Sequence, residues 1–192
     1  MKKFTQIIQS LSGKYSFPWL FLCLVASVFL LQNPWFGQEH LKNLTGGYNM
    51  IDMQFYNSPE EIRHYLDALQ QEGRSAYRLL LGFDFFFILS LMGVVEVLLY
   101  KLSTRSGLKR TFTLVRWLPL GGACFDLLET SSMLVNSSIY PGNFTPSIYM
   151  STFSTPLKWG FMAATLVSVT ILLLLNLPHR IQNRKKNTPY ET

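Results

Sequence analysis

Four apolar blocks dominate this chain of 192 residues, and each is close to the ~20 residues that a helix needs to cross a bilayer. Apolar residues make up 48% of the sequence and charged residues only 15%, and the apolar residues are concentrated in the four blocks. We therefore predict an all-α, polytopic membrane protein built as a bundle of four transmembrane helices. The predicted spans are residues 17–33, 76–100, 112–135 and 157–177.

The first block follows Lys2 and Lys3, as the apolar part of a signal peptide would. However, its apolar residues begin only near residue 17, and no small-residue cleavage site comes before the sequence QNPWF. We interpret this block as an anchor that stays in the membrane.

Basic residues set the expected orientation, because cytoplasmic loops are enriched in Lys and Arg. They lie before the first block, around the short link between the second and third, and after the fourth. Both ends are therefore expected in the cytoplasm and loops 34–75 and 136–156 outside the cell membrane. The net charge of +6 is then a topology signal, and nucleic acid is not an expected partner. The basic residues are Lys2, Lys3, Lys14, Lys101, Arg105, Lys109, Arg110, Arg116, Arg180, Arg184, Lys185 and Lys186.

Two helices are expected outside the four spans. Residues 1–14 carry an apolar stripe that predicts a surface helix, although a frayed end fits equally well, and 178–192 form a basic tail. Ser58-Pro59-Glu60-Glu61 is a capping box that begins a helix over 58–72, which Gly73 stops or bends. The segment 48–56 alternates apolar and polar residues and is expected to be extended.

Other motifs are sparse. Cys23 and Cys124 both fall in apolar blocks and suggest neither a disulfide nor a metal site. Sequons begin at Asn43, Asn136 and Asn143, which would matter only in a host that glycosylates them. No nucleotide-binding, zinc-protease or serine-hydrolase motif is present, so the sequence leaves the cofactor unknown.

Acidic residues inside the predicted spans are the strongest functional signal. A charge at the bilayer centre costs on the order of 2.5–3.5 kcal/mol and by default marks a functional site. Asp126 and Glu129 lie in the third span and Asp84 in the second, at similar depths on the outer side of the bilayer. We expect these three carboxylates to share one site.

Basic and phenolic side chains are available at the same depth. Lys158 begins the fourth span, and Arg74 enters the second. Tyr77 is seven residues before Asp84, which places both on one helix face. The candidate binding residues are therefore Arg74, Tyr77, Asp84, Asp126, Glu129 and Lys158.

A second pair of charges is expected nearer the cytoplasmic side. Glu96 and Arg116 lie at matching depths on adjacent predicted spans. One acid with one base is a common way to satisfy both, so we interpret them as a structural ion pair.

Several functions remain open for the acidic site. It could bind or transport a small ligand or ion, in which case a homo-oligomer is expected. It could also only hold the helices together, in a structural or accessory subunit of a membrane complex. A metal-assisted hydrolase is a third alternative, although no His lies in the site and the nearby bases oppose a cation.

Three motifs resemble those of a family of small four-span membrane proteins of unassigned function. They are GRSAY followed by Asp84, DLLE in the third span, and TPLKW at the start of the fourth. The resemblance covers about residues 50–165. It implies the four-span architecture and a shared polar cluster of Gly73, Arg74, Tyr77, Asp84, Asp126, Glu129 and Lys158. It implies no named activity, and Thr130 stands where an asparagine is expected.

Overall fold

The computed structural model describes residues 2–13, 16–142 and 145–186, and every regular element in these ranges is helical. The prediction of an all-α chain is therefore confirmed. Lys14, Asn143 and the tail from 187 onward lie outside the described residues. The elements are α1 (Lys2–Leu11), α2 (Ser16–Leu31), α3 (Gln38–Leu44), the 3-10 helix η1 (Ile51–Met53), α4 (Pro59–Ala68), α5 (Gln70–Arg105), α6 (Lys109–Val115), α7 (Trp117–Ile139) and α8 (Thr145–Lys186).

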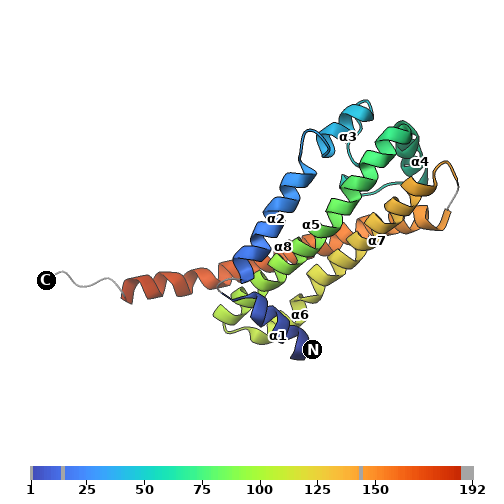
Figure 1. Ribbon diagram of the computed structural model, residues 1–192. Coiled ribbons are helices and arrows are strands. Elements are labelled where there is room, and N and C mark those ends of the chain that lie inside the picture. Colours follow the sequence, from blue (N-terminus) through green and yellow to red (C-terminus); the bar gives the residue numbers. More distant parts are fainter. Residues whose placement is uncertain (1, 14–15, 143–144, 187–192) are drawn as a thin grey trace.

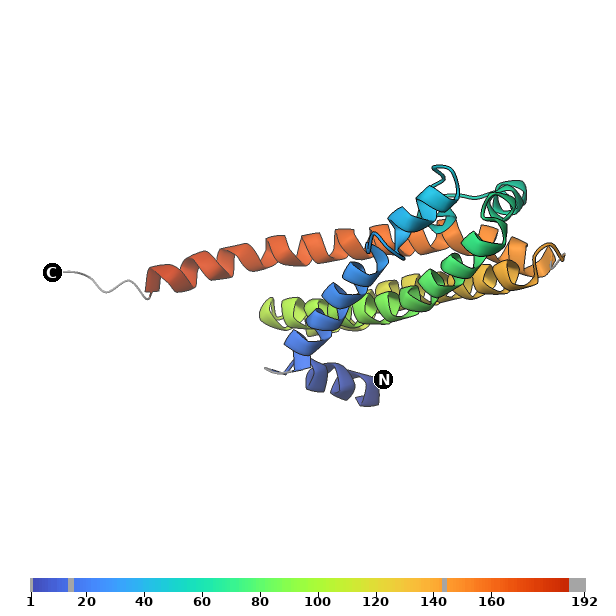
Figure 2. The same cartoon turned by 45° about the horizontal axis from the view of Figure 1, so that its top comes forward.

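Three long helices, α5, α7 and α8, form the body of the molecule, and α2 packs against α5 (Figure 1). Helices α3 and α4 lie at one end of this body, while α1 and α6 lie at the other. Helix α8 runs along α7 and projects beyond the remaining helices at its C-terminal end (Figure 2).

Two helices are long and apolar enough to cross a membrane, judged by length and composition: α5, and residues 145–177 of α8. In the apolar window of α8 only 11% of the residues are buried inside the molecule. This share is too small for the core helix of a soluble protein, whose apolar residues would be covered. Helix α2 is apolar but shorter.

Helix α4 begins with the predicted capping box. The Glu61 amide donates to Ser58 Oγ at 3.2 Å, and the Ser58 amide donates to Glu61 Oε2 at 2.7 Å. The helix ends at Ala68, earlier than residue 72, because Gln70 has a positive φ of 51° that breaks it. Gly73 therefore lies inside α5 and ends no helix.

The long helices differ from the predicted spans at their ends. Helix α5 is longer than residues 76–100 at both ends, and α8 begins at Thr145 in a region expected to be a loop. Residues 112–135 are divided between α6 and α7 at Arg116. Pro119 explains the division, because it has no N–H to donate to the carbonyl four residues earlier.

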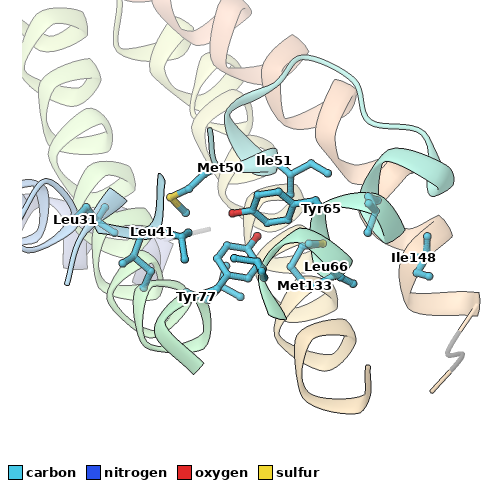
Figure 3. Close-up of a cluster of buried hydrophobic side chains, with 13 residues drawn as sticks. Leu31, Leu41, Met50, Ile51, Tyr65, Leu66, Tyr77, Met133 and Ile148 are labelled. Atoms are coloured by element: carbon cyan, nitrogen blue, oxygen red, sulfur yellow. The ribbon is translucent and has the colours of Figure 1, made fainter. Parts of the chain in front are cut away.

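The segment between α3 and α4 is not extended as expected. It contains η1, and Met50 and Ile51 are buried in an apolar core with Tyr65, Tyr77 and Met133 from α4, α5 and α7 (Figure 3). This core ties the segment onto the long helices. It thereby places Asp52, which lies between Ile51 and Met53, near the acids of α5 and α7.

Candidate functional site

Lys158 is the centre of a buried group of charged side chains. It lies on α8 and is 5% exposed. Its Nζ is 3.1 Å from Asp126 Oδ1 and 2.5 Å from Glu129 Oε2. The structure thus brings together three residues of the predicted site, because α7 and α8 run side by side.

Lys158 also holds the segment between α3 and α4. Its ammonium donates to the backbone carbonyl of Asp52 at 3.1 Å, and the indole N–H of Trp159 donates to the carbonyl of Gln54 at 2.8 Å. Two consecutive side chains of α8 thus fix two carbonyls of this segment. The segment covers the end of the site that faces α4.

Asp84 joins the group from α5. Its Oδ2 accepts a hydrogen bond from the Thr130 hydroxyl at 2.8 Å, and its carboxylate interacts electrostatically with Asp52 and Asp126. Glu129 is held in the same way, because its Oε1 accepts from the Thr155 hydroxyl at 2.5 Å. Neutral hydroxyls on α7 and α8 therefore orient the acids.

Two tyrosines complete the site. Tyr77 is fully buried, and its ring meets the ring of Tyr65 edge to face, with centroids 5.4 Å apart (Figure 3). Neither hydroxyl has a hydrogen-bond partner among the described residues. The Tyr77 hydroxyl interacts electrostatically with Tyr65 and with the carboxylates of Asp52, Glu129 and Asp84.

We refer to Asp52, Tyr77, Asp84, Asp126, Glu129 and Lys158 as the polar cluster. Five of these six were predicted from the sequence. Arg74 does not take part: its guanidinium donates to the Leu66 carbonyl at 3.2 Å and stacks 5.2 Å from the centre of the Tyr140 ring.

Sequence reasoning missed Asp52, Thr130 and Thr155. Asp52 is one of several acids in a long loop, and only its apolar neighbours Met50 and Ile51 signalled that it would be buried. Burial raises the pKa of the Asp52 carboxyl above its ordinary value, against the opposing effect of the Lys158 charge. This carboxyl is therefore easier to protonate in the folded protein than in the unfolded chain.

A cavity of about 290 Å³ adjoins the polar cluster between α5, α7 and α8. Of the described residues that line it, Asp126 alone is charged and Thr165 alone is an uncharged polar residue. The other lining residues are apolar or glycine: Ile88, Leu91, Met92, Val95, Leu98, Pro119, Gly122, Ala123, Met162, Leu166 and Val169. We call this cavity the groove.

The groove runs in line with the polar cluster. Asp84 precedes Ile88 by four residues on α5, so both lie on one helix face. On α7, Asp126 follows Gly122 by four residues and belongs to both the groove and the cluster. The apolar groove therefore meets the polar cluster at Asp126.

Glu96 and Arg116 lie apart from the polar cluster, on α5 and between α6 and α7. Both are buried, at 0% and 4% exposure, and their charges attract each other. The Arg116 guanidinium also lies 5.4 Å from the centre of the Trp117 ring. This placement is compatible with the predicted structural pair, which remains a prediction.

The chain was compared with protein families, curated proteins and solved structures. The family model PigN, described as phosphatidylinositolglycan class N (PIG-N), matches residues 3–192. The chain belongs to this family. No curated protein and no solved structure matches it. Membership of the PIG-N family and the two long apolar helices together identify a membrane protein.

Proposed function

We propose that this PIG-N family chain is an integral membrane protein that binds an amphipathic lipid, with the lipid chain in the groove and its polar group at the polar cluster. The observation that carries the proposal is the composition of the groove, which is apolar along its length and ends at the buried Asp126. Ligand sites of this size are typically apolar with a few polar groups that fix orientation.

The family name supports a lipid of this kind, because a phosphatidylinositolglycan joins lipid chains to a hydroxyl-rich headgroup. Carboxylates accept hydrogen bonds from hydroxyls, and four of them lie in the polar cluster. A role in phosphatidylinositolglycan synthesis is therefore the biological context that we infer.

The arrangement of the helices in the membrane belongs to the same proposal. We place α2, α5, α7 and α8 across the bilayer, with α1, α6 and the basic tail on the cytoplasmic side and α3 and α4 on the opposite side. Basic residues near α6 support this orientation. The contacts made by the acids of α7 lower the cost of inserting this helix and support its place across the bilayer. The groove would then lie at the depth of lipid chains.

A metal-assisted reaction is not part of the proposal. Among the described residues, no three Asp, Glu, His or Cys side chains are arranged to hold a metal ion. The alternative is that the polar cluster only holds the helices together, and lipid binding by groove variants distinguishes the two roles.

The test compares two substitutions on the exposed face of α8. Leu166 lines the groove and is 67% exposed, whereas Leu174 is 59% exposed and does not line it. Leu166→Trp should fill the groove, and Leu174→Trp is the matched control. Each displaced methylene costs about 0.8 kcal/mol, so displacing two should weaken binding of a diacyl phosphatidylinositol about tenfold or more.

Binding is measured by the rise in melting temperature of the detergent-purified protein as lipid is added. The control should bind like the wild type. Equal binding by both variants, or no stabilisation of the wild type by any added lipid, would show that the groove holds no lipid and would favour a structural role.

A further inference from the structure

Three apolar side chains are exposed together on the segment that precedes α4. Met53, Phe55 and Tyr56 are 52%, 68% and 57% exposed, and they lie within four consecutive residues outside the long helices. Single exposed apolar residues are ordinary, but several side by side mark an interaction surface. We call residues 53–56 the apolar tip.

The backbone beneath the apolar tip is held in place. Asn57 is 1% exposed, and its side-chain amide donates to the Ile51 carbonyl at 2.7 Å, which closes the segment on itself. The indole N–H of Trp159 donates to the Gln54 carbonyl within the tip. The core under the segment is filled by Met50 and Ile51 (Figure 3). The apolar tip is therefore displayed outward on a fixed backbone.

The apolar tip continues an exposed apolar face of α8. Trp159, which bonds to the tip, precedes Leu166 by seven residues, so the two side chains share one helix face about 10 Å apart. Leu166 is 67% exposed and lines the groove. In the proposed arrangement lipid covers this face, because only 11% of the apolar window of α8 is buried inside the molecule.

The chemistry of the apolar tip suits the boundary between lipid and water. None of its four residues is charged, whereas α4 carries Glu60 and Glu61 in its first turn. Tyr and Trp are enriched at membrane interfaces, because an apolar ring and a polar N–H or O–H group find their preferred surroundings there together. Tyr56 lies in the tip and Trp159 bonds to it, so both residue types are present at this position.

We propose that the apolar tip inserts into the lipid–water interface on the side of α3 and α4, next to the end of the groove at Asp126. The inference rests on the proposed arrangement of the helices in the membrane and adds a bilayer contact outside them. The partner is the interfacial layer of the bilayer, which the rings of Phe55 and Tyr56 enter. Since Asp52 directly precedes the tip, this contact anchors the segment that covers the polar cluster.

The experiment measures the depth of three labelled positions in bilayer nanodiscs. The full chain is used with Cys23→Ala and Cys124→Ala, which remove its two native thiols. A fluorophore is attached at Phe55→Cys, Glu60→Cys or Val167→Cys. Each label is exposed to aqueous iodide and to nitroxide lipids that carry the quencher either near the headgroup or deep in the acyl chain.

The label at Phe55→Cys should be quenched most by the shallow nitroxide lipid. Its quenching by iodide should be about threefold or more weaker than at Glu60→Cys, since apolar surroundings exclude a charged quencher. Glu60→Cys is the matched control, because this residue is exposed only five positions away on α4. Val167 is 56% exposed near the middle of the apolar part of α8, so the deep nitroxide lipid should quench its label most.

A second reading removes a native ring while the label stays at another position. With the label at Met53→Cys, adding Phe55→Ser should raise quenching by iodide about twofold or more, because less apolar surface then holds the tip in the interface. Adding Glu60→Ser instead should leave quenching by iodide unchanged.

The outcomes separate the inference from the membrane arrangement. Suppose that the deep nitroxide lipid quenches Val167→Cys, while iodide quenches Phe55→Cys as strongly as Glu60→Cys. The arrangement then stands and the inference is wrong, because the apolar tip faces water and is left for a protein partner to cover. Equal quenching of Met53→Cys with and without Phe55→Ser would also overturn the inference. If no nitroxide lipid quenches Val167→Cys, the arrangement and the inference both fail.

Discussion

The predicted Glu96–Arg116 pair and the polar cluster are both buried, yet their charges differ in number. The predicted pair would match one acid with one base, and the two charges attract each other. The polar cluster has four acids for one base, and it opens onto an apolar groove through Asp126. A balanced pair can be satisfied within the protein. An unbalanced cluster of buried acids is stabilised by protons or by a bound group, and this difference is why we propose a binding role for the cluster and a structural one for the pair.

Removing the only base of the polar cluster should have the largest effect. Lys158→Met leaves Asp126 and Glu129 buried without their counter-charge and releases the Asp52 carbonyl. We expect a loss of about 3–5 kcal/mol in the free energy of unfolding, the usual cost of breaking a buried ion pair on one side. Denaturant unfolding of the detergent-solubilised protein measures this loss. A loss no larger than that of Arg116→Met would contradict the claim that Lys158 compensates more charge than Arg116.

The contact of α7 with α8 supports the polar cluster, and a glycine permits it. A Cβ at Gly121 would lie 2.6 Å from the Phe161 ring, whereas one at Gly122 would make an ordinary contact of 3.5 Å with Phe161. Gly121→Ala should therefore cost about 1–3 kcal/mol through overpacking, and Gly122→Ala should be close to neutral. Melting temperatures of the two variants test this, and equal values would remove the argument for a close approach at Gly121.

Charge neutralisation should distinguish the pair from the cluster. If Glu96 and Arg116 satisfy only each other, the double variant Glu96→Gln/Arg116→Met should be more stable than the sum of its single variants predicts. Interhelical polar contacts in membranes are coupled by about 0.6 kcal/mol on average and up to about 1.7. A double-mutant cycle measures the coupling. A coupling of zero would mean that the two residues are not a pair.

The pH dependence of stability should report on Asp52 of the polar cluster. Because burial raises the pKa of Asp52 above its ordinary 3.8, the folded state holds its proton more tightly than the unfolded state. The free energy of unfolding should therefore fall as pH rises from about 3.8 to the higher folded pKa, with a slope of at most about 1.4 kcal/mol per pH unit. The groups that interact electrostatically with Asp52 and affect this slope are Tyr65, Tyr77, Asp84, Asp126, Glu129 and Lys158.

Asp52→Asn is the variant that isolates this effect. Its melting temperature should change less between pH 4 and pH 6 than that of the wild type. Asp67→Asn serves as the control, because Asp67 is exposed on α4 and lies outside the cluster. Parallel profiles for wild type and Asp52→Asn would show that Asp52 does not contribute.

The sequence predicted the parts of the site that lie on long helices. Asp84, Asp126, Glu129 and Lys158 could be assigned a depth, because helix rise fixes the depth of each residue along a span. Arg74 was predicted with them, but depth does not reveal the direction of a long side chain. In the structure Arg74 contacts the Leu66 carbonyl and the Tyr140 ring.

The loop contribution could not be predicted in this way. Asp52 enters the polar cluster only because Met50 and Ile51 are buried in a core shared by α4, α5 and α7. The orienting hydroxyls of Thr130 and Thr155 also depend on how the helices pack, and Thr in a membrane helix carries no distinctive spacing signal. Likewise, the sequon residue Asn136 accepts a hydrogen bond from Ser147 and is buried, which its motif does not indicate.

The most direct test of the account is to map where a lipid chain contacts the protein. The protein in bilayer nanodiscs is exposed to a phosphatidylinositol that carries a photoreactive group on one acyl chain, and the adducts are located by mass spectrometry. We predict adducts concentrated on groove residues such as Met92, Met162 and Leu166, and their loss in Leu166→Trp but not in Leu174→Trp. Adducts spread evenly over the exposed apolar faces of α2 and α8, with the same pattern in both variants, would contradict the lipid site.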